Sequence, residues 1–153
     1  MKNAYYSADD YQAHRSIGYL LRSSSKLMTQ HVEALFAEEE VSFVQWVILI
    51  NLRDKLATTA AELCQGICHD SGALTRVLEQ LEKRGLIQKK RSQKDRRTVE
   101  LKLTAAGHKA IQTVLPRIVG FLNNLLDDDF TKDEIDTLIN LLSRLKTKLS
   151  QVS

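Results

Sequence analysis

The positive charge of this chain is concentrated between Lys83 and Lys102. Nine residues of this segment are basic and two are acidic, which gives it a net charge of +7, whereas the whole chain carries only +3. A focused cationic segment is typical of a surface that contacts phosphates. Lysines alone would suit a solvated hairpin whose edge must not aggregate. The arginines of the loop, Arg96 and Arg97, favour bidentate contacts with phosphates or bases.

A helix is predicted directly before this segment, beginning at Asp70 or Ser71, which can cap it, and ending just before Gly85. Its buried stripe would be Leu74, Val77, Leu78 and Leu81. The outer surface of its first turns is then left to Ser71, Gly72, Thr75 and Arg76. Small residues let a helix start approach the major groove, and Thr and Arg can contact base edges and phosphates. An ordinary capped helix explains the polar start, but not the basic hairpin that follows.

Two short strands joined by a cationic loop are predicted after the helix. Leu86 and Ile87 begin the first strand, and apolar residues alternate with polar ones from residue 98 to residue 103 in the second. In the loop, Asp95 is within reach of Arg97 and would hold that side chain extended, so that less entropy is lost on binding. An extended arginine suits a narrow minor groove, where the negative potential is enhanced.

Amphipathic helices must position this pair of elements. The first is predicted from about Asp10 to the acidic run Glu38–Glu40, with its apolar residues on one stripe. Two capping boxes begin the second and third helices: Ser42 with Gln45, and Thr59 with Glu62.

Two further helices are predicted after the hairpin. Thr104 can cap one that runs to about Leu126, and Pro116 should kink that helix or break it in two. The last opens with a capping box of Thr131 and Glu134 and runs almost to the end of the chain. The apolar faces of these flanking helices need a partner, which a two-fold dimer or an intramolecular bundle would supply.

Composition narrows the function classes. A chain of 153 residues makes one domain or two small lobes that share a core. No apolar run is long enough to span a bilayer and no secretory leader is recognisable, so we expect a cytoplasmic protein with no membrane partner. The sequence contains no Walker loop, nucleophile elbow, H-E-x-x-H pair or dinucleotide fingerprint. We therefore expect neither an enzyme nor a cofactor.

The runs DSGALTRVLEQLEKRGLI and KDRRTVELKLTAAG, in this order, resemble the MarR family of bacterial transcription regulators. The most specific parts are GALTR, the L-E-K-R-G-L helix stop, and a D-R-R wing before a strand that ends in L-T-x-x-G. The resemblance implies a mainly α fold with a small β-wing. Residues 41–104 would form a winged helix-turn-helix DNA-binding domain, and residues 1–40 and 105–153 the N- and C-terminal dimerisation helices.

The resemblance also implies a homodimer that binds a pseudo-palindromic operator in double-stranded DNA, usually as a repressor, and is released by a small molecule or an oxidant. It makes Ser71, Thr75 and Arg76 the major-groove readers, and Arg97, paired with Asp95, the minor-groove arginine. With their neighbours, the predicted DNA-binding residues are Ser71, Gly72, Ala73, Thr75, Arg76, Lys94, Asp95, Arg96 and Arg97.

A cavity for a small aromatic or anionic effector is expected where the dimerisation helices meet the reading module. Arg22, His31 and Trp46 are the candidates to line it. Trp46 could equally be part of the core, and His31 an ordinary surface residue.

A redox- or metal-responsive regulator is the alternative, built on Cys64, Cys68 and His69. These ligand types suit zinc, but C-x3-C-H is a weak signal. The thiol-based peroxide sensors of the family have a reactive cysteine in the first helix, where this chain has none. On a continuous helix, the two cysteine Cβ atoms would lie about 5 to 6 Å apart, beyond the roughly 3.5 to 4.5 Å of a disulfide. We therefore expect two buried small apolar side chains, with no disulfide between them and no metal.

Overall fold

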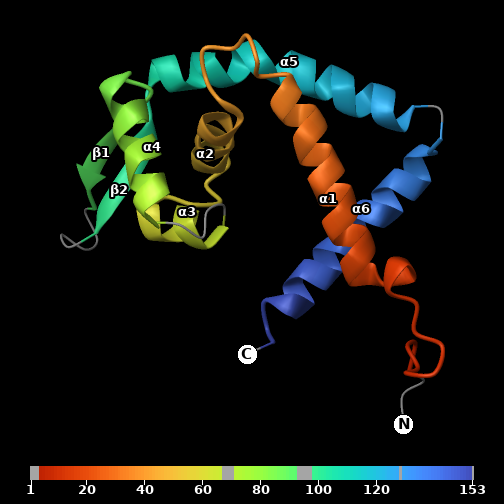
Figure 1. The fold of residues 1–153 in the computed structure, drawn as a ribbon. Coiled ribbons are helices and arrows are strands. Elements are labelled where there is room, and N and C mark those ends of the chain that lie inside the picture. The colour runs from red at the N-terminus through yellow and green to blue at the C-terminus, as the bar shows by residue number, and fades with distance from the viewer. Residues whose placement is uncertain (1–3, 67–70, 93–97, 128, 153) are drawn as a thin grey trace. The chain divides into compact units, whose positions relative to one another are not determined.

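The structure is a computed structural model that describes residues 4–66, 71–92, 98–127 and 129–152. Its elements, in chain order, are η1 (Ala13–Arg15), α1 (Ile17–Ala34), α2 (Phe43–Arg53), α3 (Ala60–Gly66), α4 (Ser71–Lys83), β1 (Ile87–Arg91), β2 (Val99–Leu103), α5 (Ala105–Leu126) and α6 (Lys132–Leu149) (Figure 1). The predicted mainly helical fold with one two-stranded hairpin is confirmed. The described residues divide into two compact units, which meet in the sequence between Leu115 and Pro116.

The first unit contains a core of apolar side chains from α2, α3, α4, the hairpin and the first part of α5. Its largest fully buried side chains are Ile48, Leu49, Leu63, Leu81, Ile87, Ile111, Val41 and Val114. The two strands pair antiparallel, with Ile87 opposite Leu103 and Arg91 opposite Val99. In Figure 1 the green helix α4 lies beside β1. The N–H of Leu101 donates to the carbonyl oxygen of Thr58 over 2.8 Å, which ties β2 to the segment before α3.

The first long helix is shorter than predicted at both ends. It begins at Ile17, where the Ser16 hydroxyl accepts the N–H of Tyr19 over 3.2 Å, and it ends at Ala34 instead of near Glu38. The hydroxyl oxygen of Tyr6 accepts the N–H of Ile17 over 2.9 Å. These two oxygens satisfy main-chain donors that a helix start leaves without internal partners, so the local polar groups set the boundary where the apolar pattern did not.

The predicted capping boxes are confirmed at three helix starts. In each, the first side chain accepts the N–H of the third helical residue, and that residue's side chain accepts the N–H of the cap. The pairs are Ser42 with Gln45 at α2, Thr59 with Glu62 at α3, and Thr131 with Glu134 at α6.

The predicted Thr104 cap of α5 is also confirmed, because the N–H of Gly107 donates to its hydroxyl oxygen over 3.1 Å. Pro116 was predicted to kink this helix or to break it in two. The break is wrong, since α5 runs from Ala105 to Leu126, and the kink stays a prediction. A proline removes one main-chain donor from the ladder, but the bonds of its neighbours can continue the helix.

The second unit consists of α5 from Pro116 onwards and α6. No residue of α6 is buried, although the helix is amphipathic. Its exposed large apolar side chains are Leu138, Ile139, Leu141, Leu142 and Leu149. Within the described residues, none of the helices combines the length and the apolar character that crossing a membrane requires.

Candidate nucleic-acid interface

The helix α4 turns one face to the core and the other to solvent. Leu74, Leu78 and Leu81 are buried, and Val77 is only half-buried, so the predicted stripe is correct except at that position. Gly85 ends the helix with a φ of 68°, in the left-handed conformation predicted for it. Ser71 is the first residue of the helix, not its cap.

The first turns of α4 present their polar side chains outwards, as predicted. The exposed residues there are Ser71, Gly72, Ala73, Thr75 and Arg76. The Thr75 hydroxyl donates to the carbonyl oxygen of Ser71 over 2.9 Å, which leaves its oxygen able to accept a further donor. Within the described part of the chain, no ion pair holds the Arg76 guanidinium. The helix start therefore offers the Arg76 guanidinium and the Thr75 hydroxyl on a surface of small side chains.

An ion pair fastens α4 to the basic hairpin. Lys89 Nζ lies 2.7 Å from Glu82 Oε2, with each side chain about two-fifths exposed. On β1 the basic side chains of Lys89, Lys90 and Arg91 are all exposed. On β2, Leu101 is buried while Val99 is 46% exposed, so the predicted alternation of buried and exposed residues is incomplete. The hairpin thus carries the exposed basic side chains of β1 beside α4.

The end of α4, the start of β1 and the start of α5 meet at one tight joint. The Thr104 hydroxyl donates to the Gly85 carbonyl oxygen over 2.6 Å, and the Thr104 N–H donates to that of Leu86 over 3.2 Å. Gly107 is buried against the same strand start: a Cβ there would overlap the Leu86 carbonyl oxygen and lie 2.9 Å from Leu103 Cδ2. No role was predicted for Gly107 from the sequence, although it is the last residue of the L-T-x-x-G run.

Part of the predicted interface lies outside the described residues. This holds for the wing residues Lys94, Asp95, Arg96 and Arg97 and for the helix cap Asp70. The predicted Asp95–Arg97 pair therefore stays a prediction, and so do the major-groove roles of Ser71, Thr75 and Arg76.

The predicted effector residues do not converge within one chain. Arg22 and His31 are both exposed on α1, and nine residues at about 100° each put them on opposite sides of the helix. Trp46 is half-buried on α2, and its ring centroid lies 5.8 Å from that of Phe36. Among the described residues, the buried Nε1 of Trp46 has no hydrogen-bond partner. A buried donor of this kind calls for an acceptor from elsewhere.

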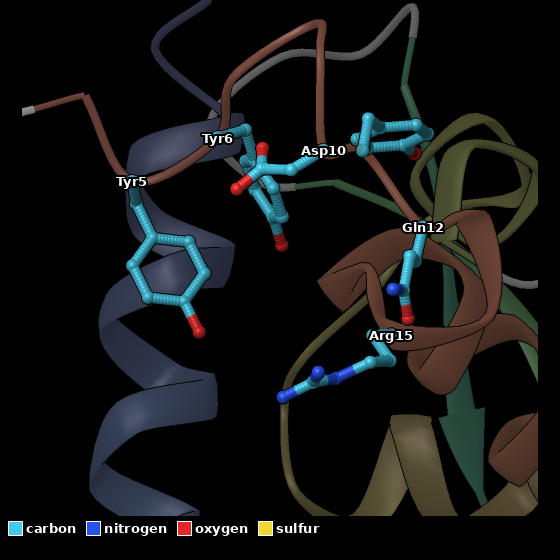
Figure 2. Close-up of a pocket in the computed structure, with 6 residues that line it drawn as sticks. Tyr5, Tyr6, Asp10, Gln12 and Arg15 are labelled. Carbon is cyan, nitrogen blue, oxygen red and sulfur yellow. The ribbon is translucent and has the colours of Figure 1, made fainter.

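Two of the hollows in the first unit illustrate that other residues line them. One of about 240 Å³ lies at the N-terminal segment, where the edges of the Tyr5, Tyr6 and Tyr11 rings meet (Figure 2). The second, of about 610 Å³, is lined by Glu38, Glu39, Glu40, Val41, Arg84, Leu86, Ala106, Lys109, Ala110, Thr113 and Val114. Neither contains any of the three predicted effector residues.

Cys64 is a free thiol and is half-buried, so the prediction that it is fully buried is wrong. Its predicted partners Cys68 and His69 lie outside the described residues. Among the residues the structure does describe, no three His, Cys, Asp or Glu side chains are grouped to hold a metal ion.

The pKa values of two exposed glutamates are lowered by their cap positions. The N–H and hydroxyl of Thr58, and then those of Thr59, lower the pKa of Glu62 from its ordinary 4.5. The N–H and hydroxyl of Thr131 lower the pKa of Glu134 in the same way. These shifts belong to helix starts and not to the candidate interface.

Comparison with known proteins places these features in one family. A family model described as the MarR family matches residues 41–99. The organic hydroperoxide resistance transcriptional regulator of Bacillus subtilis is 31% identical over 99 residues, which cover 65% of this chain and 67% of that protein. The HTH-type transcriptional regulator SarZ of Staphylococcus haemolyticus is 24% identical over 141 residues, or 92% of each chain. A solved structure of a mutant MarR from E. coli complexed with operator DNA is 26% identical, with a TM-score of 0.63 and coverage of 88% of this chain and 99% of that one.

Proposed function

Since the chain belongs to the MarR family, and is thus a transcription regulator that binds DNA, we propose that it is a homodimeric repressor of a pseudo-palindromic operator. The observation that carries this proposal is the exposed polar start of α4, fastened at its other end to a basic hairpin through Glu82 and Lys89. A helix that contacts bases in the major groove needs an exposed start with small side chains. A wing needs positive charge beside that helix.

The start of α4 would choose the sequence. Arg76 is able to make two parallel hydrogen bonds to O6 and N7 of a guanine, which is the commonest specific contact in the major groove. Thr75 would contact a base or a phosphate through its hydroxyl oxygen. Ser71, Gly72 and Ala73 would bring the positive end of the helix dipole close to the phosphates.

The wing would add affinity for DNA through contacts with the minor groove and the phosphates. Arg97, held by Asp95, would enter the minor groove, with Lys94 and Arg96 on the adjacent phosphates. Each phosphate that such a cation neutralises releases counterions, so binding through the wing should depend steeply on salt. Variants at α4 would lose base contacts and variants at the wing would lose phosphate contacts. We therefore expect the salt dependence of DNA affinity to differ between the two kinds of variant.

The dimer would be built by residues 1–40 and 105–153, with residues 41–104 as the DNA-binding domain. Large apolar side chains are exposed on α1 as well as on α6; on α1 they are Ile17, Tyr19, Leu20, Leu21, Leu27 and Met28. Exposed apolar faces of this extent mark an interaction surface. Two copies of α4 would then enter successive major grooves about 34 Å apart.

A small aromatic or anionic effector would release the operator. The buried Nε1 of Trp46, which lacks a hydrogen-bond partner among the described residues, supports a polar ligand near the start of α2, with Arg22 or His31 contributed by the dimer. An effector shifts the equilibrium only if it binds better to the arrangement with the wrong spacing of the reading helices. Carboxylates and phenols, which accept an indole N–H, are the classes to screen first.

Replacement of Arg76 tests the proposal. The protein is titrated at several salt concentrations with a duplex that the wild-type chain selects from a random pool. Arg76→Ala should weaken binding by about 1 to 3 kcal/mol and relax the base preference at one position of each half-site. Arg76→Lys, the matched control, keeps the charge and should keep the salt slope while losing the base preference. Wild-type affinity and preference in both variants would refute the assignment of α4 as the reader.

Oxidant control through Cys64 and Cys68 is the second candidate. The relative named for organic hydroperoxide resistance, together with the free half-buried thiol of Cys64, gives the reason to test it. Operator affinity is measured before and after treatment with an organic hydroperoxide, for the wild type and for Cys64→Ser. Unchanged wild-type affinity, together with no stoichiometric zinc in protein purified without chelators, would exclude this mode of control.

A further inference from the structure

Gln45 is one of the few polar side chains in the core of the first unit, with 9% of its surface exposed. It belongs to the first turn of α2 and closes the capping box there. Its Oε1 accepts the N–H of Ser42 over 3.3 Å and the Arg84 guanidinium, through Nη1, over 3.1 Å. Its Nε2 donates to Gln80 Oε1 over 3.2 Å. One amide thus bonds two residues that follow it by 35 and 39 positions in the sequence.

The orientation of this amide is fixed by chemistry. The main-chain N–H of Ser42 and the Arg84 guanidinium can only donate, so the carbonyl oxygen of Gln45 must face both of them. The amino group is then left for Gln80, whose own amide must present its oxygen. Any rotation of the Gln45 side chain would lose several bonds together, which gives this contact a single geometry.

Gln80 lies in the last turn of α4 and Arg84 directly follows the helix, whereas the proposed reading residues lie at its other end. From Gln80 to Ser71 the helix rises about 14 Å, at about 1.5 Å per residue. A tilt of about 5° at the fastened end would move the first turn by about 1 Å, which is enough to take a good hydrogen bond beyond its useful range of about 2.7 to 3.2 Å.

Apolar packing sets the approximate tilt of α4 but leaves room for a directional contact. The side chains that α4 turns to the core, Leu74, Leu78 and Leu81, are apolar, and packing of such side chains leaves helix crossing angles a scatter of about 15 to 20°. The Glu82–Lys89 pair and the Gly85–Thr104 bond fasten α4 to the hairpin and to α5, not to α2. Hydrogen bonds are directional, so the Gln45 amide narrows the angle between α4 and α2 beyond what apolar packing fixes.

We propose that Gln45 is a positioning residue for DNA recognition: its amide, bonded to Gln80 and Arg84, sets the angle at which α4 presents its first turns to a duplex. The inference rests on the proposed function, in which α4 reads the bases. Gln45 itself touches no DNA in this scheme. It acts through the direction of the helix, and its loss should therefore harm sequence preference more than general affinity for DNA.

The test compares two duplexes: one that the wild-type chain selects from a random pool, and a scrambled duplex of the same length. Gln45→Met keeps the length of the side chain but can make none of the three hydrogen bonds. We expect it to lose about tenfold in affinity for the selected duplex, which is about the discrimination that one good base contact provides. Affinity for the scrambled duplex and its salt slope should stay at the wild-type values, because the phosphate contacts remain.

Two further variants separate positioning from plain stability. Gln45→Glu keeps the acceptors for Ser42 and Arg84, and the Gln80 amide can turn to donate, so this variant should recover most of the preference. Gln112→Met makes the same change at an exposed position of α5 and should leave both affinities unchanged. Because Gln45 is buried, thermal unfolding establishes that each variant is folded at the temperature of the titration.

Gln80→Met interrupts the same bond from its exposed end and keeps the proposal testable even if Gln45→Met does not fold. It should lose preference in the same direction. The proposal is overturned if the ratio of the two affinities stays within twofold of wild type in the folded variants, or if both duplexes lose affinity equally. It is also overturned if Gln45→Glu behaves as Gln45→Met does. A wild-type chain that selects no duplex would instead refute the proposed function.

Discussion

Gly107 gives the sharpest test of how the hairpin is joined to the helices, through the substitution Gly107→Ala. A Cβ at this position would overlap the main-chain carbonyl oxygen of Leu86 and lie 2.9 Å from Leu103 Cδ2, whereas ordinary contacts begin near 3.4 Å. The obstacle is main chain, which cannot rotate away as the end of a flexible side chain can. The start of α5 must therefore withdraw from the start of β1.

Three effects set the size of the change. Overpacking at a tight site costs about 1 to 3 kcal/mol. Withdrawal also stretches the bonds from Thr104 to Gly85 and Leu86, each worth about 0.5 to 1.5 kcal/mol. Alanine is the better helix former by about 1 kcal/mol, which offsets part of the loss. We expect a net loss of about 2 to 4 kcal/mol, a large part of the roughly 5 to 15 kcal/mol that stabilises a typical domain.

Gly120→Ala is the matched control in the same helix. Apart from Gly120 itself, its chain neighbours and the nearby main chain of its own helix, no heavy atom of the described residues lies within 4 Å of a Cβ built there, so helix propensity is the effect we expect to act. This variant should gain about 1 kcal/mol. The free energy of unfolding is measured in urea through the fluorescence of Trp46, the single tryptophan of the chain. A loss below about 0.5 kcal/mol in Gly107→Ala, the range of ordinary surface changes, would refute the close approach.

Two further predictions concern helix ends. Lys55 follows α2 with a φ of 56°, so Lys55→Gly should raise the free energy of unfolding by about 0.5 to 1 kcal/mol in the same urea experiment; a lowered value would contradict the strain. The lowered pKa of Glu62 means that its stabilising effect is full above the ordinary value of 4.5 and is lost as the pH falls through the lowered pKa. The melting temperature of Glu62→Gln should therefore lie below that of the wild type at neutral pH, and the gap should close under acid conditions. A gap that is independent of pH would contradict the role of the carboxylate.

The features that the sequence predicted well are local ones. A capping box needs two residues three positions apart, and a left-handed stop needs one glycine, so both can be read from a short window. The same holds for the buried stripe of α4, whose residues recur at helical spacing. This is why the caps at Ser42, Thr59, Thr104 and Thr131, the stop at Gly85, and the exposed start of α4 all appear in the structure where they were expected.

The features that the sequence analysis missed depend on contacts between distant residues. Gln45 was recognised only as a cap, because nothing in its neighbourhood indicates a bond to Gln80, 35 positions later. Gly107 has a helical neighbourhood, and only the position of the Leu86 carbonyl oxygen explains why a side chain cannot stand there. At Pro116, the local rule predicted a kink or a break, and the helix is not broken.

The fastening of α4 has a consequence for regulation. Its C-terminal end is held by Gln45 on α2 and by the joint with α5, while its exposed start, which would read DNA, is farthest from both. A displacement of α2 or of the start of α5 would therefore move the exposed start of α4 without contacting it. Trp46 is the next residue after Gln45, and its buried Nε1 has no hydrogen-bond partner in the part of the chain that the structure describes. Its main-chain N–H donates to the Ser42 carbonyl oxygen over 2.9 Å in the same first turn. An acceptor that binds at that indole would act within one residue of the contact that sets the angle of α4, so the proposed effector response and the proposed positioning role should share the first turn of α2.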